Sequence, residues 1–160
     1  MMSNKRREII VLKNVGIIFR NFAGEARRLN NAGDRNFNAS VSKDQADMLR
    51  SKGFRIKELA PNEYSDETTY LLKVKVSYRF DAPNVNVITS RCTRRLGEET
   101  IGELDRMSIE NCDISITGSA WTKPSGESGV TAYLSSLYAT LREDPLALEY
   151  SSMDNEEDPF

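Results

Sequence analysis

The stretch Leu71-Leu72-Lys73-Val74-Lys75-Val76-Ser77-Tyr78-Arg79-Phe80 alternates between apolar and polar side chains along its whole length. Successive side chains of a β-strand point to opposite faces, so this period of two predicts a strand with one apolar and one cationic face. We expect the apolar face to pack in the core of a sheet. The cationic face, with Lys73, Lys75 and Arg79, is typical either of a solvated strand or of a surface that contacts a polyanion.

Further strands are expected on both sides of this stretch. The turn sequence at residues 81–84 predicts that residues 85–91 return as the hairpin partner of residues 71–80. The last strand, expected at residues 130–141, keeps its phase only if one residue is inserted at Ser135 and Ser136. It then carries Tyr133 and Tyr138 on its outer face. Other strands are expected at residues 35–41 and 109–119, and one or two at residues 9–22, with a bulge or bend at Gly16.

One or two short helices are expected among the strands. Ser42 and Gln45 form a capping-box pattern, and Gly53 supplies a left-handed stop, which together predict a helix over residues 43–52. Acids at the start of residues 98–107 favour a second short helix, because the helix dipole stabilises negative charge there. The fold is therefore expected to be mainly β.

At 160 residues the chain has the length of one domain. Residues 1–8 are polar and basic and residues 151–160 are too polar to pack, so we expect disorder in both and one folded domain at residues 9–150. The apolar run at residues 9–12 is too short for a signal peptide or a membrane helix. We expect a cytoplasmic protein with no membrane contact, whose two cysteines, Cys92 and Cys112, are free.

The net charge of −2 conceals an uneven distribution of charge. All 22 Lys and Arg lie in residues 1–142 with 17 of the 24 acids, so this body carries a net charge of +5. Residues 143–160 hold the other seven acids and no base. A basic body with an acidic tail indicates a domain that binds a polyanion and an appended interaction segment, although acidic tails also serve solubility alone.

The sequence lacks the residues that several kinds of active site require. It contains no histidine, which excludes Ser-His and Cys-His nucleophilic sites and zinc sites with His ligands. The glycine-rich phosphate-binding motifs are also missing, so we expect no cofactor, no metal and no enzymatic activity. A weaker alternative is a metal-dependent nuclease that uses the acidic group Glu103, Asp105, Glu110 and Asp113.

Basic and aromatic residues share the predicted outer faces and loops. Cations neutralise phosphates, and exposed aromatic rings stack on unpaired bases without regard to sequence. The alternative is a solvated surface for the cations and ordinary core or hairpin packing for the aromatic residues. The candidate nucleic-acid-binding residues are Arg20, Phe22, Arg27, Arg28, Arg35, Lys73, Lys75, Arg79, Arg91, Arg94, Arg95, Trp121, Lys123, Tyr133 and Tyr138.

The end of the sequence carries a run of acids closed by Pro-Phe: Asp154, Glu156, Glu157, Asp158, Pro159 and Phe160. This run resembles the acidic tip of bacterial single-stranded DNA-binding proteins. The resemblance implies a partner-binding tail that docks on replication and repair proteins and can occupy the protein's own DNA groove. The long Gly/Gln-rich linker of the bacterial family is missing here, which shortens the reach of the tail.

A second resemblance covers most of the body. The strings at residues 17–24, 33–37, 88–91 and 128–134 (IIFRNFAG, GDRNF, ITSR and SGVTAYL) look like those of bacteriophage single-stranded DNA-binding proteins. This resemblance implies an OB-fold-like, partly open antiparallel barrel of five to six strands.

Together these features predict a protein that binds single-stranded DNA without sequence preference and protects it in phage DNA replication or recombination in the host cytoplasm. The expected partners are single-stranded DNA and, through the tail, replication or recombination proteins, and a homo-oligomer is compatible with the sequence. The alternative from a different class is a protein-interaction module, an adaptor or inhibitor that binds a host replication protein through Phe160.

Overall fold

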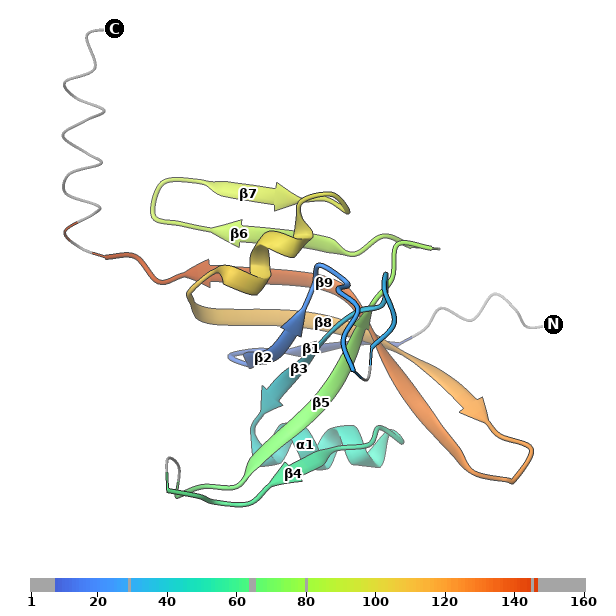
Figure 1. Cartoon of the computed structure of the whole chain (residues 1–160). Coiled ribbons are helices and arrows are strands. Elements are labelled where there is room, and N and C mark those ends of the chain that lie inside the picture. The colour runs from blue at the N-terminus through green and yellow to red at the C-terminus, as the bar shows by residue number, and fades with distance from the viewer. Residues whose placement is uncertain (1–7, 29, 64–65, 80, 145, 147–160) are drawn as a thin grey trace, which may run out of the picture.

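The computed structural model describes residues 8–28, 30–63, 66–79, 81–144 and 146. As predicted, this part of the chain is mainly β, with two short helices (Figure 1). The strands are β1 (Ile9–Leu12), β2 (Gly16–Asn21), β3 (Arg35–Val41), β4 (Lys57–Leu59), β5 (Thr69–Val76), β6 (Asn84–Ile88), β7 (Thr93–Leu96), β8 (Ile109–Thr122) and β9 (Ser128–Leu141). The helices are α1 (Lys43–Ser51) and the 3-10 helix η1 (Ile101–Arg106).

The strands form one open, mixed sheet. Six of them follow a single path in the order β1-β8-β9-β5-β3-β2, while β4 pairs with β5 and the β6–β7 hairpin joins through β6 to β9. In the described part of the chain β1 pairs only with β8, and β2 only with β3, so the path does not close. The six-stranded path agrees with the predicted partly open barrel. The sheet is not wholly antiparallel, however, because β5 and β6 both run parallel to β9.

The predicted hairpin between residues 71–80 and 85–91 is wrong. One edge of β5 is occupied by β3, and the other by β4 and then by β9, so no edge is left for β6. Both β5 and β6 instead lie along β9 in the same direction, first at Ala132 and Tyr133 and then from Ser136 to Thr140. The turn sequence at residues 81–84 therefore interrupts the strand without reversing the chain.

The core lies on the face of β5 that the alternation predicts. Leu72, Val74 and Val76 are buried, whereas Lys73 and Lys75 are exposed. The apolar faces of β8 and β9 contribute to the same hydrophobic core. The apolar and cationic sides of β5 are thus the inner and outer sides of the sheet.

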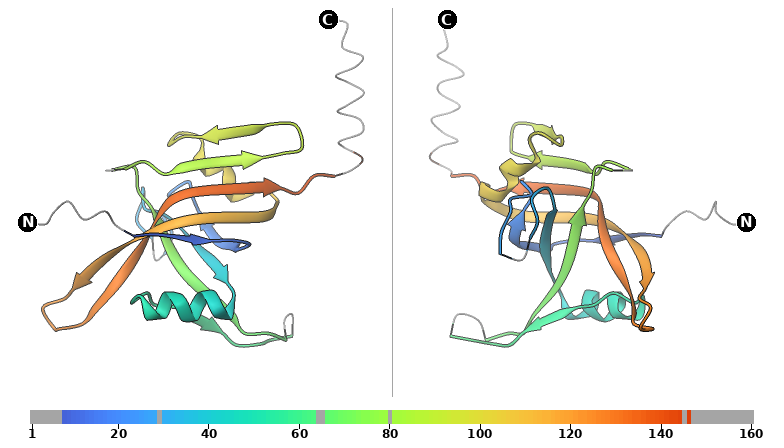
Figure 2. Two further views of the ribbon diagram at one scale, coloured as in Figure 1. Left: turned by 180° about the vertical axis from the view of Figure 1, so that it is seen from behind. Right: turned by 45° about the vertical axis from the view of Figure 1, so that its right-hand side comes forward.

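The hairpin of β8 and β9 is the longest feature of the fold, and its far end extends beyond the other strands (Figure 2). Its register shifts by one residue between Ser115, opposite Ser136, and Ile116, opposite Leu134. This bulge confirms the predicted insertion at Ser135 and Ser136. The predicted loop that begins at Trp121 is shorter than expected, because Trp121 still pairs with Gly129 within the hairpin.

The first hairpin-like pair, β2 with β3, also contains a bulge, at a different residue from the one predicted. Gly16 pairs regularly with Ser40, whereas Phe19 and Arg20 both lie opposite Phe37, between the pairs Ile18–Asn38 and Asn21–Asn36. The backbone of Phe19 is left-handed, with a φ of 49°. The bulge therefore falls on a large aromatic residue, although glycine is the residue that adopts such a backbone most easily.

Helix α1 begins and ends as predicted. Both hydrogen bonds of the capping box between Ser42 and Gln45 are formed, and Gly53 ends the helix with a φ of 95°. The second predicted helix is reduced to the six residues of η1. Within the described residues no helix is long and apolar enough to cross a membrane. The acidic tail at residues 151–160, and residues 1–7, lie outside the described part of the chain.

Candidate nucleic-acid interface

We call the side of the sheet opposite to the core, which carries Lys73, Lys75, Tyr133 and Tyr138, the outer face. Lys75 pairs in register with Tyr133 where β5 meets β9, and Tyr133 pairs with Thr117 of β8. Register partners lie on the same face of a sheet, and neighbouring strands are about 4.8 Å apart. An ammonium group and a phenol ring therefore lie side by side on the outer face.

A second row of outer-face residues crosses the other half of β9. Tyr138 pairs with Asp113 of β8 and with Asn86 of β6, and Asn86 pairs with Arg95 of β7. The extra residue at Ser135 restores the alternation, so both tyrosines point to the same side. Tyr138 is 40% exposed, and its hydroxyl oxygen accepts a hydrogen bond of 3.3 Å from the side-chain amide of Asn84.

A groove of about 790 Å³ lies beside the first row. It separates β9 from the segment that connects β5 to β6, and its lining includes Tyr133, Arg79 and the exposed Ile9 of β1. Asp81 also lines it, so the groove is not uniformly basic. The interrupted strand described above creates this groove, because residues 77–79 and 81–82 lie outside the sheet while β9 continues.

Trp121 lies on the same side of the β8–β9 hairpin as Tyr133, four residues along from the partner of Tyr133. Two cations flank its ring: the Arg55 guanidinium carbon at 5.1 Å and the Lys123 ammonium nitrogen at 5.6 Å from the centroid. Both cations also pair with Glu127, and the hydrogen bond from Arg55 is the main cause of a lowered pKa of that carboxyl. The ring also packs against Gly129, so its free surface is limited.

Three of the predicted residues, Phe22, Arg20 and Arg35, pack against other parts of the fold and are not exposed on the outer face. The prediction that Phe22 offers an exposed plane is wrong, because its ring is fully buried and stacks on Phe37 with centroids 4.9 Å apart. The half-buried guanidinium of Arg20 donates hydrogen bonds to the carbonyl oxygens of Leu104 and Met107, at 2.9 and 2.6 Å. These contacts join β2 to η1.

Arg35 is half-buried at the start of β3. Its guanidinium lies 5.7 Å from the centroid of the Tyr78 ring and donates a hydrogen bond of 3.2 Å to the Glu98 carbonyl oxygen. Burial raises the pKa of Tyr78, while Arg35 acts in the opposite direction. Arg35 thus belongs to the packing around Tyr78 and not to the exposed rows.

The remaining predicted cations are exposed but lie elsewhere. Arg27 and Arg28 belong to the connection between β2 and β3, and Arg91 to the turn between β6 and β7. Arg94 pairs with Glu103 of η1 at 2.9 Å and has the buried Val87 as its register partner, so it alternates to the side opposite Arg95. The partner-binding residues from Asp154 to Phe160 lie outside the described part of the chain.

The acidic group that suggested a nuclease is dispersed. Asp105 accepts hydrogen bonds from the backbone amides of Phe22 and Ala23, and Asp113 accepts one from the amide of Asn14. In the part of the chain that the structure describes, no three His, Cys, Asp or Glu residues are grouped so that they could hold a metal ion.

Phe19 is an exposed aromatic residue that is absent from the predicted nucleic-acid-binding residues. Its side chain is 62% exposed. Simple alternation from the buried Ile17 would place Phe19 in the core, and no local signal marks the bulge that prevents this. Asn86 and Arg55 were also missed, since their positions depend on pairings between distant strands.

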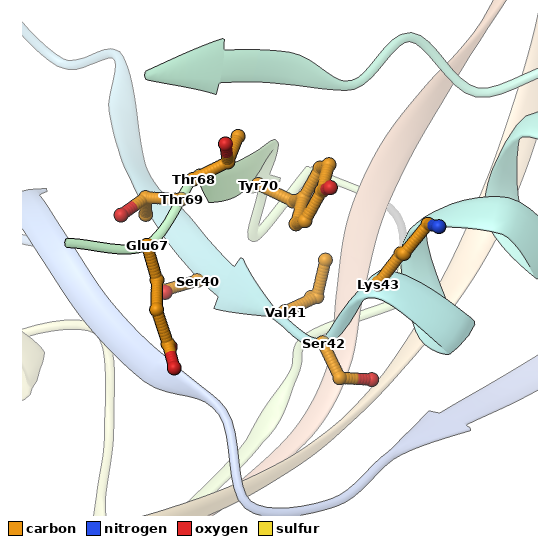
Figure 3. Close-up of a pocket in the computed structure, with 8 residues that line it drawn as sticks. All are labelled: Ser40, Val41, Ser42, Lys43, Glu67, Thr68, Thr69 and Tyr70. Carbon is orange, nitrogen blue, oxygen red and sulfur yellow. The ribbon is translucent and has the colours of Figure 1, made fainter. Parts of the chain in front are cut away.

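A second cavity of about 530 Å³ lies at the opposite end of β5 (Figure 3). Its lining comes from the end of β3, the start of α1 and the residues around Thr69, and includes Tyr70 and Lys43. None of the predicted nucleic-acid-binding residues lines this cavity. It is therefore a natural reference region for experiments on the outer face.

One protein family has a model that matches almost the whole chain. The model of the family described as "Putative phage ssDNA-binding domain" matches residues 1–159. The chain belongs to this phage ssDNA-binding domain family. The resemblance to phage single-stranded DNA-binding proteins, predicted from short strings of residues, is thereby confirmed. Among curated proteins, none matches the chain.

Solved structures share the fold of this family member. The C-terminally truncated single-stranded DNA-binding protein of bacteriophage Enc34 aligns with a TM-score of 0.56 at 13% identity, over 86% of this chain and 88% of that one. A second structure of the Enc34 protein aligns with a TM-score of 0.54 at 13% identity, over 86% and 83% of the two chains. The single-stranded DNA-binding protein gp2.5 of bacteriophage T7 aligns over 97% of this chain and 98% of that one, with a TM-score of 0.46 at 9% identity.

Proposed function

We propose that this protein binds single-stranded DNA without sequence preference along the outer face of β5, β9 and β8. The observation that carries the proposal is the pairing of Lys75 with Tyr133 beside the groove that Arg79 lines, in a chain of the phage ssDNA-binding domain family. This arrangement places a phosphate-binding group next to a stacking plane. The solved Enc34 structures support the fold on which the pairing depends.

The chemistry of the outer face suits unpaired nucleotides better than a duplex. Lys73, Lys75, Arg79 and Arg95 are exposed and can neutralise successive phosphates. Tyr133 and Tyr138 present aromatic rings, and each stacked base contributes roughly 1–3 kcal/mol whatever its identity. In a duplex the bases are already stacked on one another, so only the phosphate contacts would remain.

Titration of labelled oligo(dT) tests the proposal. Fluorescence anisotropy should show saturable binding at low salt, with a linear fall of log K against log salt concentration. A mixed-sequence oligonucleotide of the same length should bind with similar affinity, and a duplex of that length more weakly. Failure of the protein to bind oligo(dT) at low salt would contradict the proposed function.

The proposal extends to a role in the host cytoplasm, where the protein would protect single-stranded DNA during phage replication or recombination without degrading it. Asp105 and Asp113 support this reading, because both hold backbone amides of neighbouring segments. Incubation of the oligonucleotide with protein and Mg²⁺ should leave it intact. Cleavage that disappears in Asp113→Asn would favour the nuclease instead.

We also propose that the acidic segment from Asp154 to Phe160 recruits replication or recombination proteins. This part of the proposal rests on the sequence of the tail and on its charge, which is opposite to that of the outer face. Deletion of residues 154–160 should tighten DNA binding at low salt, because the tail would no longer compete for the cations. Unchanged affinity would contradict self-competition. A chain that binds a host replication protein but no DNA would be the alternative adaptor or inhibitor.

A further inference from the structure

Phe19 stands out among the exposed apolar residues because its backbone is also strained. A φ of 49° is a genuine outlier for a residue as bulky as phenylalanine. The side chain gains little burial in return, since 62% of it remains exposed. Neither the backbone preference nor the hydrophobic effect explains a phenylalanine at this position.

The fold holds the strained conformation from both sides. Arg20, the second residue of the bulge, donates hydrogen bonds to the Ile17 carbonyl oxygen at 3.1 Å, to that of Leu104 in η1 and to that of Met107 just after η1. Phe22 and Ala23 follow the end of β2, and their backbone amides donate hydrogen bonds of 2.8 and 3.1 Å to the carboxylate of Asp105 in η1. Arg20 and Asp105 therefore fix β2 against η1 while Phe19 remains exposed.

The bulge that carries Phe19 lies close to the lysines of the outer face. Ile18 and Asn21, on either side of the bulge, pair with Asn38 and Asn36, and the other partners of these two asparagines are Lys73 and Lys75. With strands spaced by about 4.8 Å, the bulge is about 10 Å across the sheet from these lysines, on the side away from Tyr133. A cation is also adjacent, because Arg27 donates a hydrogen bond of 3.2 Å to the Arg20 carbonyl oxygen.

We propose that Phe19 is a base-stacking residue, held by the β2 bulge for an unpaired base of the DNA that crosses β5. The inference rests on the proposed function and adds a direction to it: the strand would run across the sheet from Tyr133 over Lys73 and Lys75 to β2. Phosphates would lie over the lysines, and bases would stack at both ends of the path. A ring fixed before binding loses little freedom when a base stacks on it.

Three substitutions at one position test this. Phe19→Ala and Phe19→Gly both remove the ring, and Phe19→Gly also relieves the positive φ, so it should unfold at an equal or higher denaturant concentration than the wild type. Both should weaken oligo(dT) binding at least fivefold, as loss of a stacked base does elsewhere. Phe19→Tyr should keep the wild-type affinity. Leu146→Ala, at an exposed apolar residue after the end of β9, is the control and should change affinity less than twofold.

The outcomes distinguish a failure of the proposed stacking role of Phe19 from a failure of the proposed binding of single-stranded DNA. If wild-type protein binds oligo(dT) and Phe19→Gly binds it equally well, Phe19 is not a stacking residue, while the proposed function stands. If the wild type does not bind oligo(dT), the proposed function itself fails. A fivefold or larger loss in Phe19→Gly with an undiminished unfolding midpoint supports the stacking role, because a purely structural residue would not give that combination.

Discussion

Lys75 and Tyr133 are register partners in the parallel pairing of β5 with β9, and both side chains leave the sheet on its outer face. The two residues come from distant parts of the sequence, and the pairing brings a cation and an aromatic ring within one strand spacing of each other. Stacking and phosphate contact can therefore serve adjacent parts of one nucleotide. The parallel pairing is the structural basis of the proposed site.

Lys75→Gln should weaken DNA binding in a salt-dependent manner. If Lys75 neutralises one phosphate of single-stranded DNA, its loss should reduce the slope of log K against log salt concentration by about 0.7. Lys13→Gln is the matched control, since Lys13 is exposed in the turn between β1 and β2, outside the outer-face rows. Equal slopes for Lys75→Gln and the wild type, measured by anisotropy at several salt concentrations, would remove Lys75 from the site.

Tyr133→Leu should weaken oligo(dT) binding by about 1–3 kcal/mol, because the variant keeps an apolar side chain but loses the aromatic plane. Tyr133→Phe keeps the ring and should bind within about twofold of the wild type. Isothermal titration at one salt concentration is sufficient to compare the three proteins. Identical affinities for Tyr133→Leu and Tyr133→Phe would show that no base stacks on this ring.

Phe22→Ala should affect stability and leave DNA binding unchanged. The ring is fully buried against Phe37, and replacing a buried phenylalanine with alanine costs about 3–5 kcal/mol. Urea unfolding should show this loss, and the affinity for oligo(dT) should stay near that of the wild type at temperatures where the variant is folded. Weaker DNA binding with unchanged stability would mean that Phe22 leaves the core to meet the DNA.

The two cysteines should differ sharply in reactivity. Cys92 is exposed, whereas Cys112 is buried, and burial raises the pKa of the Cys112 thiol from 9.0 to about 12. Since the thiolate is the reactive form, a disulfide reagent at pH 8 should modify one thiol per native chain and two in denaturant. Rapid modification of both thiols in the native protein would contradict the burial of Cys112.

The same shift gives stability a pH dependence. Between pH 9 and 12 the unfolded chain releases the Cys112 proton while the folded chain retains it, so stability should fall as pH rises from about 9. The slope from this group is at most about 1.4 kcal/mol per pH unit. Urea unfolding from pH 8 to about 10.5 should show a steeper loss for the wild type than for Cys112→Ala. Equal slopes would mean that the thiol does not contribute.

Local patterns were sufficient to predict much of the fold. The alternation of residues 71–80 correctly separated the buried Leu72 and Val74 from the exposed Lys73. The break in phase at Ser135 and Ser136 correctly located a bulge, because one face of β9 must remain apolar on both sides of it. These signals are carried by neighbouring residues, so the sequence displays them directly.

The errors concern pairings between distant segments. A proline-containing turn sequence at residues 81–84 is compatible with a reversal or with a mere interruption, and the competition of β3, β4 and β9 for the edges of β5 decides between them. The exposed position predicted for Phe22 is wrong for a similar reason. The bulge in β2, held by contacts of Arg20 with the distant η1, exposes Phe19, while Phe22 enters the core.

Photochemical cross-linking of an oligonucleotide that contains 5-iododeoxyuridine would show whether single-stranded DNA binds on the outer face, since the excited base couples to aromatic residues stacked on it. After digestion and mass spectrometry, the cross-links should fall on outer-face residues, with Tyr133 the principal one. Tyr70, which lines the separate cavity near α1, provides the internal reference and should remain unmodified. Cross-links confined to Tyr70, with none on the outer face, would contradict the account.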